Sequence, residues 1–214
     1  YFKSRYMLGV IVPARNEEQS IGKVLHNLIE CEIDKKNIFV IDNQSSDKTA
    51  QIVKKMNIHV ISCHEIGYQA ALKKGFDELN KRNYQKFLII DGDNEIGIDS
   101  IKESLIRHNS HKIIIGYRVK IKRFAERIVN YYFNYRYGIR DLMCGVKCGD
   151  IELYNENNHL EFGIDFFKFE ELKRQDIYNF QIELNKRKET RLGSPLKVNI
   201  GLLFNLIRFI VRKV

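Results

Sequence analysis

The first half of the chain alternates short apolar runs with segments whose apolar positions recur every three or four residues. The pattern predicts strands at residues 7–12, 38–41, 58–61 and 87–90 and helices at residues 20–29, 49–56 and 68–79. We expect Pro13 to end the first strand, because proline lacks a backbone N–H. Because strands and helices alternate, the chain is expected to form an α/β fold with a mostly parallel central sheet and helices on both faces.

The second half has a less regular pattern. It predicts a strand at 113–115, an amphipathic helix dense in Tyr and Arg at 121–137, a glycine-containing loop and strand at 141–150, and a helix at 165–173. No internal repeat or low-complexity linker divides the chain. We therefore expect one catalytic domain at residues 1–197, followed by a separate C-terminal helix at residues 198–214.

Polar residues follow three of the four strands predicted in the first half, at positions 13–17, 42–47 and 91–95. In parallel sheets, ligands bind beyond the carboxyl ends of the strands. Each loop alone could be a helix cap or a solvated turn. Those explanations do not account for carboxylates at several strand ends along one sheet edge, so we predict a binding site there.

The motif Asp91-Gly92-Asp93 directly follows a predicted strand. Two carboxylates beside a glycine suit a hard cation such as Mg²⁺ or Mn²⁺, and Glu95 could supply a third oxygen. Such a cation can bridge the carboxylates to a diphosphate. Asp42 ends the second strand and is expected to accept hydrogen bonds from a nucleobase or ribose. The chain lacks the glycine-rich dinucleotide motif and the P-loop, which excludes the usual dinucleotide and P-loop modes of phosphate binding.

Four groups of residues follow one another along the first half of the chain. They are Val-Pro-Ala-Arg-Asn-Glu-Glu at 12–18, Val-Ile-Asp-Asn-Gln-Ser-Ser-Asp-Lys-Thr at 40–49, Gly67 with Ala70, Ala71 and Gly75, and Ile-Ile-Asp-Gly-Asp at 89–93. This set resembles the family-2 inverting glycosyltransferases and, within them, the dolichol-phosphate mannosyltransferase-like branch, which includes polyprenyl-phosphate glycosyltransferases. The resemblance implies the GT-A fold, a Rossmann-like domain that uses a nucleotide-diphosphate sugar and Mg²⁺ or Mn²⁺.

The same resemblance implies roles for individual residues. Pro13, Arg15, Glu17 and Asp42 would contact the nucleotide; Asp91, Asp93 and Glu95 would bind the metal; Arg118, Arg191 and Lys197 would face phosphates; and Asp93, Arg118 and Asp141 would take part in catalysis. Asn43 and Gln44 replace the family's Asp-Gly, which leaves the specificity for base and ribose open. Pro195 and Leu196 interrupt the family's Ser-Lys spacing, which leaves the role of Lys197 open.

Two kinds of acceptor fit the second half of the chain. A polyprenyl phosphate is already ionised and would be positioned by cations, which are abundant between residues 112 and 140. A sugar hydroxyl on a polysaccharide or lipid-linked oligosaccharide needs a general base, for which Asp141 and Asp165 are candidates. Asp141 could equally pair with a neighbouring arginine. We expect a hexose to pass from a GDP- or UDP-sugar to a polyprenyl phosphate.

The C-terminal segment also helps to choose between the two acceptors. Placed on a helix, residues 198–214 show a wide apolar face, with Gly201, Asn205, Arg208 and Arg212 on one narrow stripe. This pattern is typical of a helix that lies in an anionic membrane interface, although packing on the domain or on a second copy is an alternative. No apolar run reaches the roughly 20 residues that span a bilayer. We therefore expect a peripheral enzyme on the cytoplasmic face of a membrane.

The composition excludes few classes of protein function. The chain has 214 residues, a hydrophobic fraction of 44% that fits a globular domain, and a formal charge of +9 that indicates anionic partners. We find no stacking aromatics or known basic motif for nucleic acid, so no nucleic-acid partner is expected. The four cysteines are scattered, which favours reduced thiols in the cytosol. A non-catalytic protein that binds nucleotide sugars is the alternative from another class, and the intact carboxylate motif argues against it.

Overall fold

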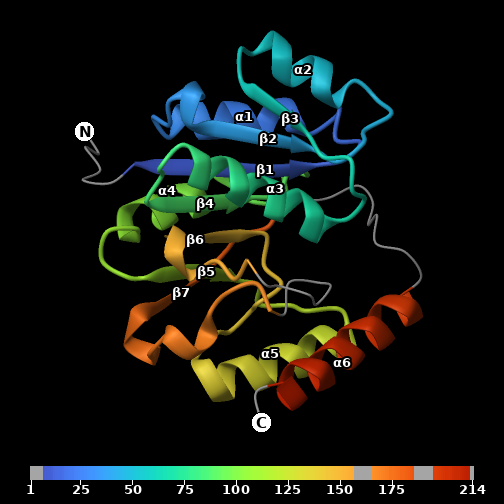
Figure 1. The fold of residues 1–214 in the computed structure, drawn as a ribbon, viewed down its shortest axis with the longest axis vertical. Helices are drawn as coiled ribbons and strands as arrows, with labels where there is room; N and C mark the ends of the chain where they lie inside the picture. The colour runs from blue at the N-terminus through green and yellow to red at the C-terminus, as the bar shows by residue number, and fades with distance from the viewer. Residues whose placement is uncertain (1–6, 157–164, 186–194, 213–214) are drawn as a thin grey trace.

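The computed structural model describes residues 7–156, 165–185 and 195–212. A seven-stranded sheet crosses the molecule in the order β3-β2-β1-β4-β6-β5-β7 (Figure 1). Its strands are β1 Leu8–Ala14, β2 Ile38–Asp42, β3 His59–Ser62, β4 Lys86–Ile90, β5 Ile113–Tyr117, β6 Val146–Asp150 and β7 Ile177–Gln181. Within this sheet only β6 runs antiparallel to its neighbours, so the predicted mostly parallel sheet is confirmed.

Helices cover both faces of the sheet, as predicted (Figure 1). One face carries α1 Ile21–Glu30 and α4 Ile98–Arg107, the other carries α3 Tyr68–Lys81, α5 Phe124–Tyr137 and α6 Pro195–Arg212, and α2 Thr49–Lys55 packs near β3. Side chains alternate along each strand. Val10 and Val12 therefore join the core under α1, whereas Ile11 joins the core under α3. Gly75 allows α3 to approach closely, since a Cβ there would lie 2.5 Å from Cγ2 of Ile11.

The strand β1 is longer than predicted, because Pro13 lies inside it and not beyond its end. Pro13 pairs with Ile41 of β2. Its carbonyl faces the other side, where it accepts from the N–H of Gly92 at 3.2 Å. The missing N–H of the proline faces that same side, and the ladder between β1 and β4 has already ended there at Ile11 and Ile89. The proline thus costs the sheet no ladder hydrogen bond.

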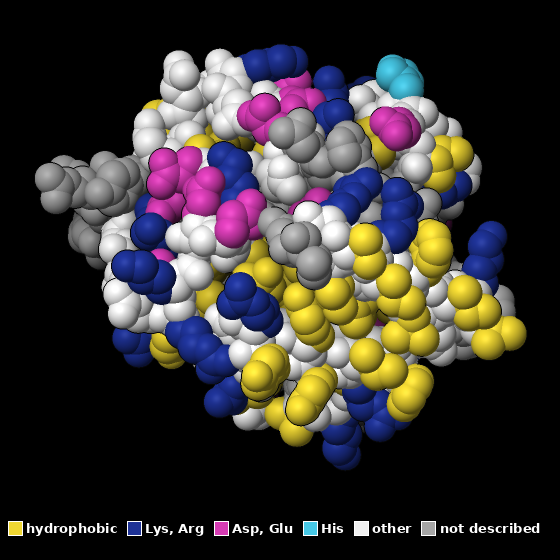
Figure 2. Space-filling view, turned by 60° about the horizontal axis from the view of Figure 1, so that its bottom comes forward, with side chains coloured by type: hydrophobic (Ala, Val, Ile, Leu, Met, Phe, Trp, Pro, Cys, Tyr) yellow, Lys and Arg dark blue, Asp and Glu magenta, His cyan; other side chains and the backbone are white. Residues whose placement is uncertain are grey.

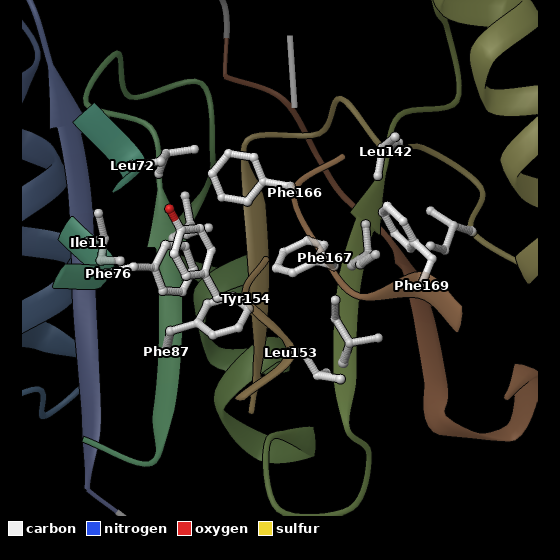
Figure 3. Packing of buried hydrophobic residues seen from close by; sticks show 14 of the residues in the cluster. Ile11, Leu72, Phe76, Phe87, Leu142, Leu153, Tyr154, Phe166, Phe167 and Phe169 are labelled. Carbon is white, nitrogen blue, oxygen red and sulfur yellow. The ribbon is translucent and has the colours of Figure 1, made fainter. Parts of the chain in front are cut away.

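The predicted helix at residues 165–173 is wrong. Tyr154 and Phe167 instead form an isolated antiparallel bridge, and only the short 3₁₀ turn Phe169–Glu171 follows. Phe166, Phe167 and Phe169 are all buried among the aromatic side chains under α3 and α5 (Figure 3). The bridge to Tyr154 keeps this segment extended, and both adjacent phenylalanine rings are accommodated in the same apolar cluster. The helix α4 and the strand β7 were not predicted.

The last helix, α6, is part of the main core. Val198, Leu202, Leu206 and Phe209 are buried in the same cluster as the inner side chains of α5. The polar stripe expected on this helix is divided, because Asn205 is buried while Arg208 and Arg212 are exposed. The boundary expected at residue 198 falls inside α6, which begins at Pro195.

Candidate active site

The loops after β1 and β2 are joined by hydrogen bonds that run in both directions. The N–H of Asn16 donates to Oγ of Ser45 at 3.0 Å, and Oδ1 of Asn16 accepts from the N–H of Ser46 at 2.7 Å. One residue further, the N–H of Glu17 donates to Oγ1 of Thr49 at 2.7 Å. These bonds hold the two loops together as one wall at the carboxyl edge of the sheet.

The residues predicted to contact a nucleotide occupy this wall in different ways. Pro13 is buried in β1, and Arg15 is exposed at the rim. Asp42 is partly exposed at the end of β2. Oε2 of Glu17 accepts from Oγ of Ser20 at 2.7 Å, so this carboxylate is engaged at the start of α1. Oδ1 of Asp42 accepts from the N–H of Ser45 at 3.3 Å, so this carboxylate also helps to hold the loop after β2.

Asn43 and Gln44 tie the end of β2 to the loop before α3. The side chain of Asn43 donates to the carbonyl of Glu65 at 2.6 Å and accepts from the N–H of Gly67 at 2.9 Å. Gln44 has a φ of 58° and donates through Nε2 to the carbonyl of His64. The two residues that depart from the family pattern thus have structural partners of their own in this chain. The left-handed backbone at Gln44 also explains why glycine suits this position.

The Asp91-Gly92-Asp93 motif lies directly beside this wall. A Cβ at Gly92 would lie 3.1 Å from the carbonyl oxygen of Pro13, which is a tight contact, so glycine favours the close approach of the motif to β1. Oδ1 of Asp91 accepts from the hydroxyl of Tyr68 at 2.9 Å. Oδ1 of Asp93 accepts from the N–H of Glu95 at 3.0 Å, which turns the chain back toward the sheet. The two carboxylates therefore stand at the centre of the carboxyl edge.

The charges around Asp91 are unbalanced. Burial and the nearby carboxylate of Asp93 raise the pKa of Asp91 to about 7, although Lys147 and the Tyr68 hydroxyl oppose the shift. Burial lowers the pKa of Lys147, whose Nζ donates to the carbonyl of Cys144. A divalent cation would relieve this repulsion, so the oxygen donors of Asp91 and Asp93 fit Mg²⁺ or Mn²⁺.

The expected third ligand, Glu95, does not complete a cluster. Among the residues that the structure describes, no three His, Cys, Asp or Glu side chains converge to hold an ion. The backbone of Glu95 is held by the N–H of Asn185, which donates to its carbonyl at 2.9 Å. Sites that bind Mg²⁺ through one or two carboxylates take further oxygens from substrate phosphates. The geometry thus suits an ion that is completed by a diphosphate.

Arg118 and Asp141 form the centre of a buried ion-pair network. Nε of Arg118 lies 2.7 Å from Oδ2 of Asp141, and Nη2 donates to Oδ1 at 3.0 Å. Nη2 also lies 3.1 Å from Glu126, which in turn pairs with Arg123 at 2.5 Å. Asn130 donates to Oδ1 of Asp141 at 3.0 Å. Asp141 therefore pairs with a neighbouring arginine, one of the two roles left open by its sequence position.

The cations expected at the phosphates differ in how they are placed. Arg118 lies at the end of β5, with 19% of its side chain exposed. Lys197 is exposed in the first turn of α6. That turn lies beside the start of α5, because Oδ1 of Asn199 accepts from the N–H of Ala125 at 3.3 Å. Arg191 lies outside the described residues.

Two side chains next to Asp91 were not among the predicted site residues, namely Tyr68 and Lys147. The sequence did carry a signal for Tyr68. It directly follows Gly67, which belongs to the motifs that resemble the family and precedes a helix at the sheet edge. Lys147 had no local signal, because a lysine on a strand normally points to solvent. Its burial results from the antiparallel insertion of β6 between β4 and β5.

The sheet order, the helices on both faces and the paired carboxylates at its carboxyl edge define a Rossmann-like α/β enzyme of the GT-A type. The chain belongs to glycosyl transferase family 2, whose model matches residues 9–151. It is therefore a glycosyltransferase, and the predicted family and enzyme class are confirmed.

Two relatives and one solved structure are similar to this chain. The chain is 29% identical to protein RfbJ of Shigella flexneri, over 53% of this chain and 86% of RfbJ. It is 24% identical to the dolichyl-phosphate beta-glucosyltransferase ALG5D of Trichomonas vaginalis, over 98% of this chain and 74% of that protein. Glucosyl-3-phosphoglycerate synthase of Mycobacterium tuberculosis, solved with Mn²⁺, UDP-glucose and glycerol 3-phosphate, superimposes with a TM-score of 0.75 at 15% identity, covering 96% of this chain and 80% of the synthase.

No helix within residues 7–156, 165–185 and 195–212 is both long enough and apolar enough to cross a bilayer.

Proposed function

We propose that this glycosyltransferase moves a hexose from a UDP- or GDP-sugar to a polyprenyl phosphate at the cytoplasmic face of a membrane. The observation that carries this choice is the state of Asp141. Its side chain is fully buried, and both of its oxygens accept hydrogen bonds from Arg118. A sugar hydroxyl needs a general base, whereas an ionised phosphate attacks without one. A site in which one of the two candidate bases, Asp141, is already occupied favours the phosphate.

The donor half of the proposal rests on the strand-end loops. Asp42 and Arg15 would bind the nucleoside, and Asp91 and Asp93 would hold Mg²⁺ or Mn²⁺ against the diphosphate. When bound, the ion would offset the negative charge that builds on the leaving nucleotide. The M. tuberculosis synthase was solved with Mn²⁺ and UDP-glucose, which supports a UDP-hexose as the first donor to test.

The acceptor half rests on cations at the start of α5 and α6. Arg118 is held rigidly by Asp141, so it can orient an anion without first losing side-chain freedom. Lys197 and Arg123 lie near this end of the two helices, and Arg191 is proposed to contribute from outside the described residues. The relative from T. vaginalis is named for a dolichyl-phosphate acceptor, which supports a lipid phosphate here.

The outer face of α5 and α6 is apolar, and we call it the α5–α6 face. It comprises the exposed side chains of Phe124, Tyr131, Tyr135, Leu196, Ile200, Phe204, Ile207 and Val211. Figure 2 shows hydrophobic side chains gathered over this end of the molecule, with Lys and Arg among and around them. A contiguous apolar surface of this kind indicates a binding surface.

The charges on the α5–α6 face favour an anionic membrane as its partner. Arg127, Arg136, Arg208 and Arg212 are exposed beside the apolar side chains. Helix α6 contains no acid between residues 195 and 212, and the acid of α5, Glu126, is buried. Apolar burial and attraction to anionic lipids act together on such a surface. The face also ends at the start of α5, close to Arg118, where a lipid phosphate would be needed.

Activity assays test the acceptor. UDP-glucose, UDP-N-acetylglucosamine and GDP-mannose are supplied with Mn²⁺, together with a short polyprenyl phosphate in detergent, a free glycan or 3-phosphoglycerate. We expect a product extractable into organic solvent, lost in Asp93→Ala and kept in the control Asp99→Ala, an exposed acid of α4. Transfer only to the glycan, abolished by Asp165→Asn, would support the hydroxyl acceptor instead. Nucleotide binding without any transfer would indicate the non-catalytic alternative.

Vesicle co-sedimentation tests the membrane contact. Deleting residues 198–214 would remove core side chains, so substitutions on the surface are the sharper test. The double variant Ile200→Ser, Phe204→Ser removes two side chains that are 59% and 58% exposed. The control is Ile106→Ser on α4, which is 52% exposed on the other side of the sheet. We expect wild type and control to sediment with phosphatidylglycerol vesicles and the double variant to stay in solution. Equal sedimentation of all three would rule out this surface.

A further inference from the structure

The hydroxyl of Tyr68 is bonded to Asp91, although the residue itself stands at the surface. Tyr68 opens α3, and 42% of it is exposed. Its hydroxyl nevertheless donates to Oδ1 of Asp91 at 2.9 Å.

The backbone before Tyr68 is held in place from the end of β2. Gly67 has a φ of 131°, a backbone conformation that glycine adopts readily and other residues rarely adopt. Its N–H donates to Oδ1 of Asn43 at 2.9 Å, and Nδ2 of Asn43 donates to the carbonyl of Glu65 at 2.6 Å. Asn43 is 4% exposed and directly follows Asp42. The position of the Tyr68 hydroxyl thus depends on the loop that follows β2.

The opposite side of the Asp91 carboxylate is closed by Gly145. A Cβ at that glycine would lie 2.3 Å from Oδ2 of Asp91, and the carbonyl of Gly145 accepts from the N–H of Asp91 at 3.3 Å. The carboxylate therefore lies between a hydrogen-bond donor and a backbone surface, which leaves it little rotational freedom. Groups that bond to a carboxylate ligand from behind set its orientation toward the metal.

We propose that Tyr68 is a positioning residue that orients Asp91 for the metal and couples the metal site to the nucleotide-side loop through Asn43. The proposal rests on the donor site given under the proposed function. It adds a role for a residue that no predicted contact with donor or acceptor includes. The hydroxyl acts as a fixed donor behind the ligand, and no proton is transferred.

Tyr68→Phe isolates the hydroxyl, because it keeps the ring and the start of α3. Mn²⁺ binding in the presence of UDP is measured by titration calorimetry and by the electron paramagnetic resonance of free Mn²⁺. We expect Mn²⁺ affinity to fall about 10-fold, the lower end for the loss of such a partner, with Tm unchanged. The matched control is Tyr84→Phe, which removes a hydroxyl that donates to Oδ1 of Asn37 at 2.9 Å. It should bind Mn²⁺ as wild type does.

A second variant tests the coupling. Asn43→Ala should weaken Mn²⁺ binding in the wild-type background and have little further effect in Tyr68→Phe, because both changes disturb the same ligand. If the losses of Mn²⁺ affinity in the two single variants add up in the double variant, the coupling is refuted. If Tyr68→Phe binds Mn²⁺ as tightly as wild type, the role of Tyr68 is refuted. Absence of nucleotide-dependent Mn²⁺ binding in wild type would instead refute the donor site itself, so the two failures are distinguishable.

Discussion

Arg118 and Asp141, 23 positions apart, meet in a two-point ion pair with contacts of 2.7 and 3.0 Å. The pair joins the end of β5 to the loop that leads into β6. Burial works to raise the pKa of Asp141, but the hydrogen bonds and charge of Arg118 hold it below its usual range. The carboxylate therefore stays ionised and serves to fix the arginine beside the predicted acceptor.

Asp141→Ala is expected to destabilise the fold. It leaves the guanidinium of Arg118 largely buried without its main partner, and breaking a buried pair costs about 3–5 kcal/mol. Urea unfolding measures the loss. Lys74→Ala is the control, since it removes a half-exposed pair with Glu78 and should change stability by less than about 0.5 kcal/mol. Equal stability of the two variants would contradict the importance of the network.

Gly145→Ala is expected to weaken metal binding in the presence of nucleotide. The new Cβ would lie 2.3 Å from Oδ2 of Asp91, so the carboxylate must move. We expect Mn²⁺ affinity in the presence of UDP to fall by at least about 10-fold, measured by calorimetry. Gly22→Ala is the matched control in α1, where the nearest atom is Cγ2 of Ile52 at 3.8 Å. That change should stabilise the protein by about 0.5–1 kcal/mol and leave binding intact.

Asp91→Asn should change the pH dependence of stability. The folded pKa of Asp91, about 7, is raised above its ordinary value of 3.8, so its ionisation disfavours the folded state. The stability it contributes is fully present below about pH 4 and is lost as the pH rises through 7. In chelator, the variant should therefore gain Tm over wild type at pH 8 and show a smaller difference at pH 5. A difference that does not vary with pH would show that Asp91 is not strained by its surroundings.

Position 44 should prefer residues that tolerate a left-handed backbone. Gln44 has a φ of 58°, which costs a β-branched residue about 1–3 kcal/mol. Gln44→Val should therefore unfold at lower urea than Gln44→Gly, although both lose the bond to the carbonyl of His64. Comparing the two variants with each other cancels that shared loss. Equal unfolding midpoints would show that the loop adapts its backbone.

Local sequence was sufficient for the first half of the fold. The apolar runs around Val10, Val40 and Leu88 have strand character, and all seven elements predicted there are present. Hydrophobic periodicity reports which face of an element is buried, and the placing of Asp91 after a buried strand follows from it. The fold class, the family and the sheet edge that carries the carboxylates could therefore be predicted from the sequence. The spacing of Ile98, Ile101 and Leu105 is also typical of a helix, which agrees with α4.

Only the tertiary structure decided how distant segments meet. The segment around Phe166 and Phe167 is extended because the core under α3 and α5 takes both rings, which no local pattern reports. The partners of Asp91 and Asp141 come from other parts of the chain, since Tyr68 opens α3 and Arg118 directly follows β5. A contact between residues far apart in the chain depends on strand order and helix packing. The sequence alone therefore determined the fold class and the carboxylates at the strand ends, and packing determined which groups of the site are engaged with one another.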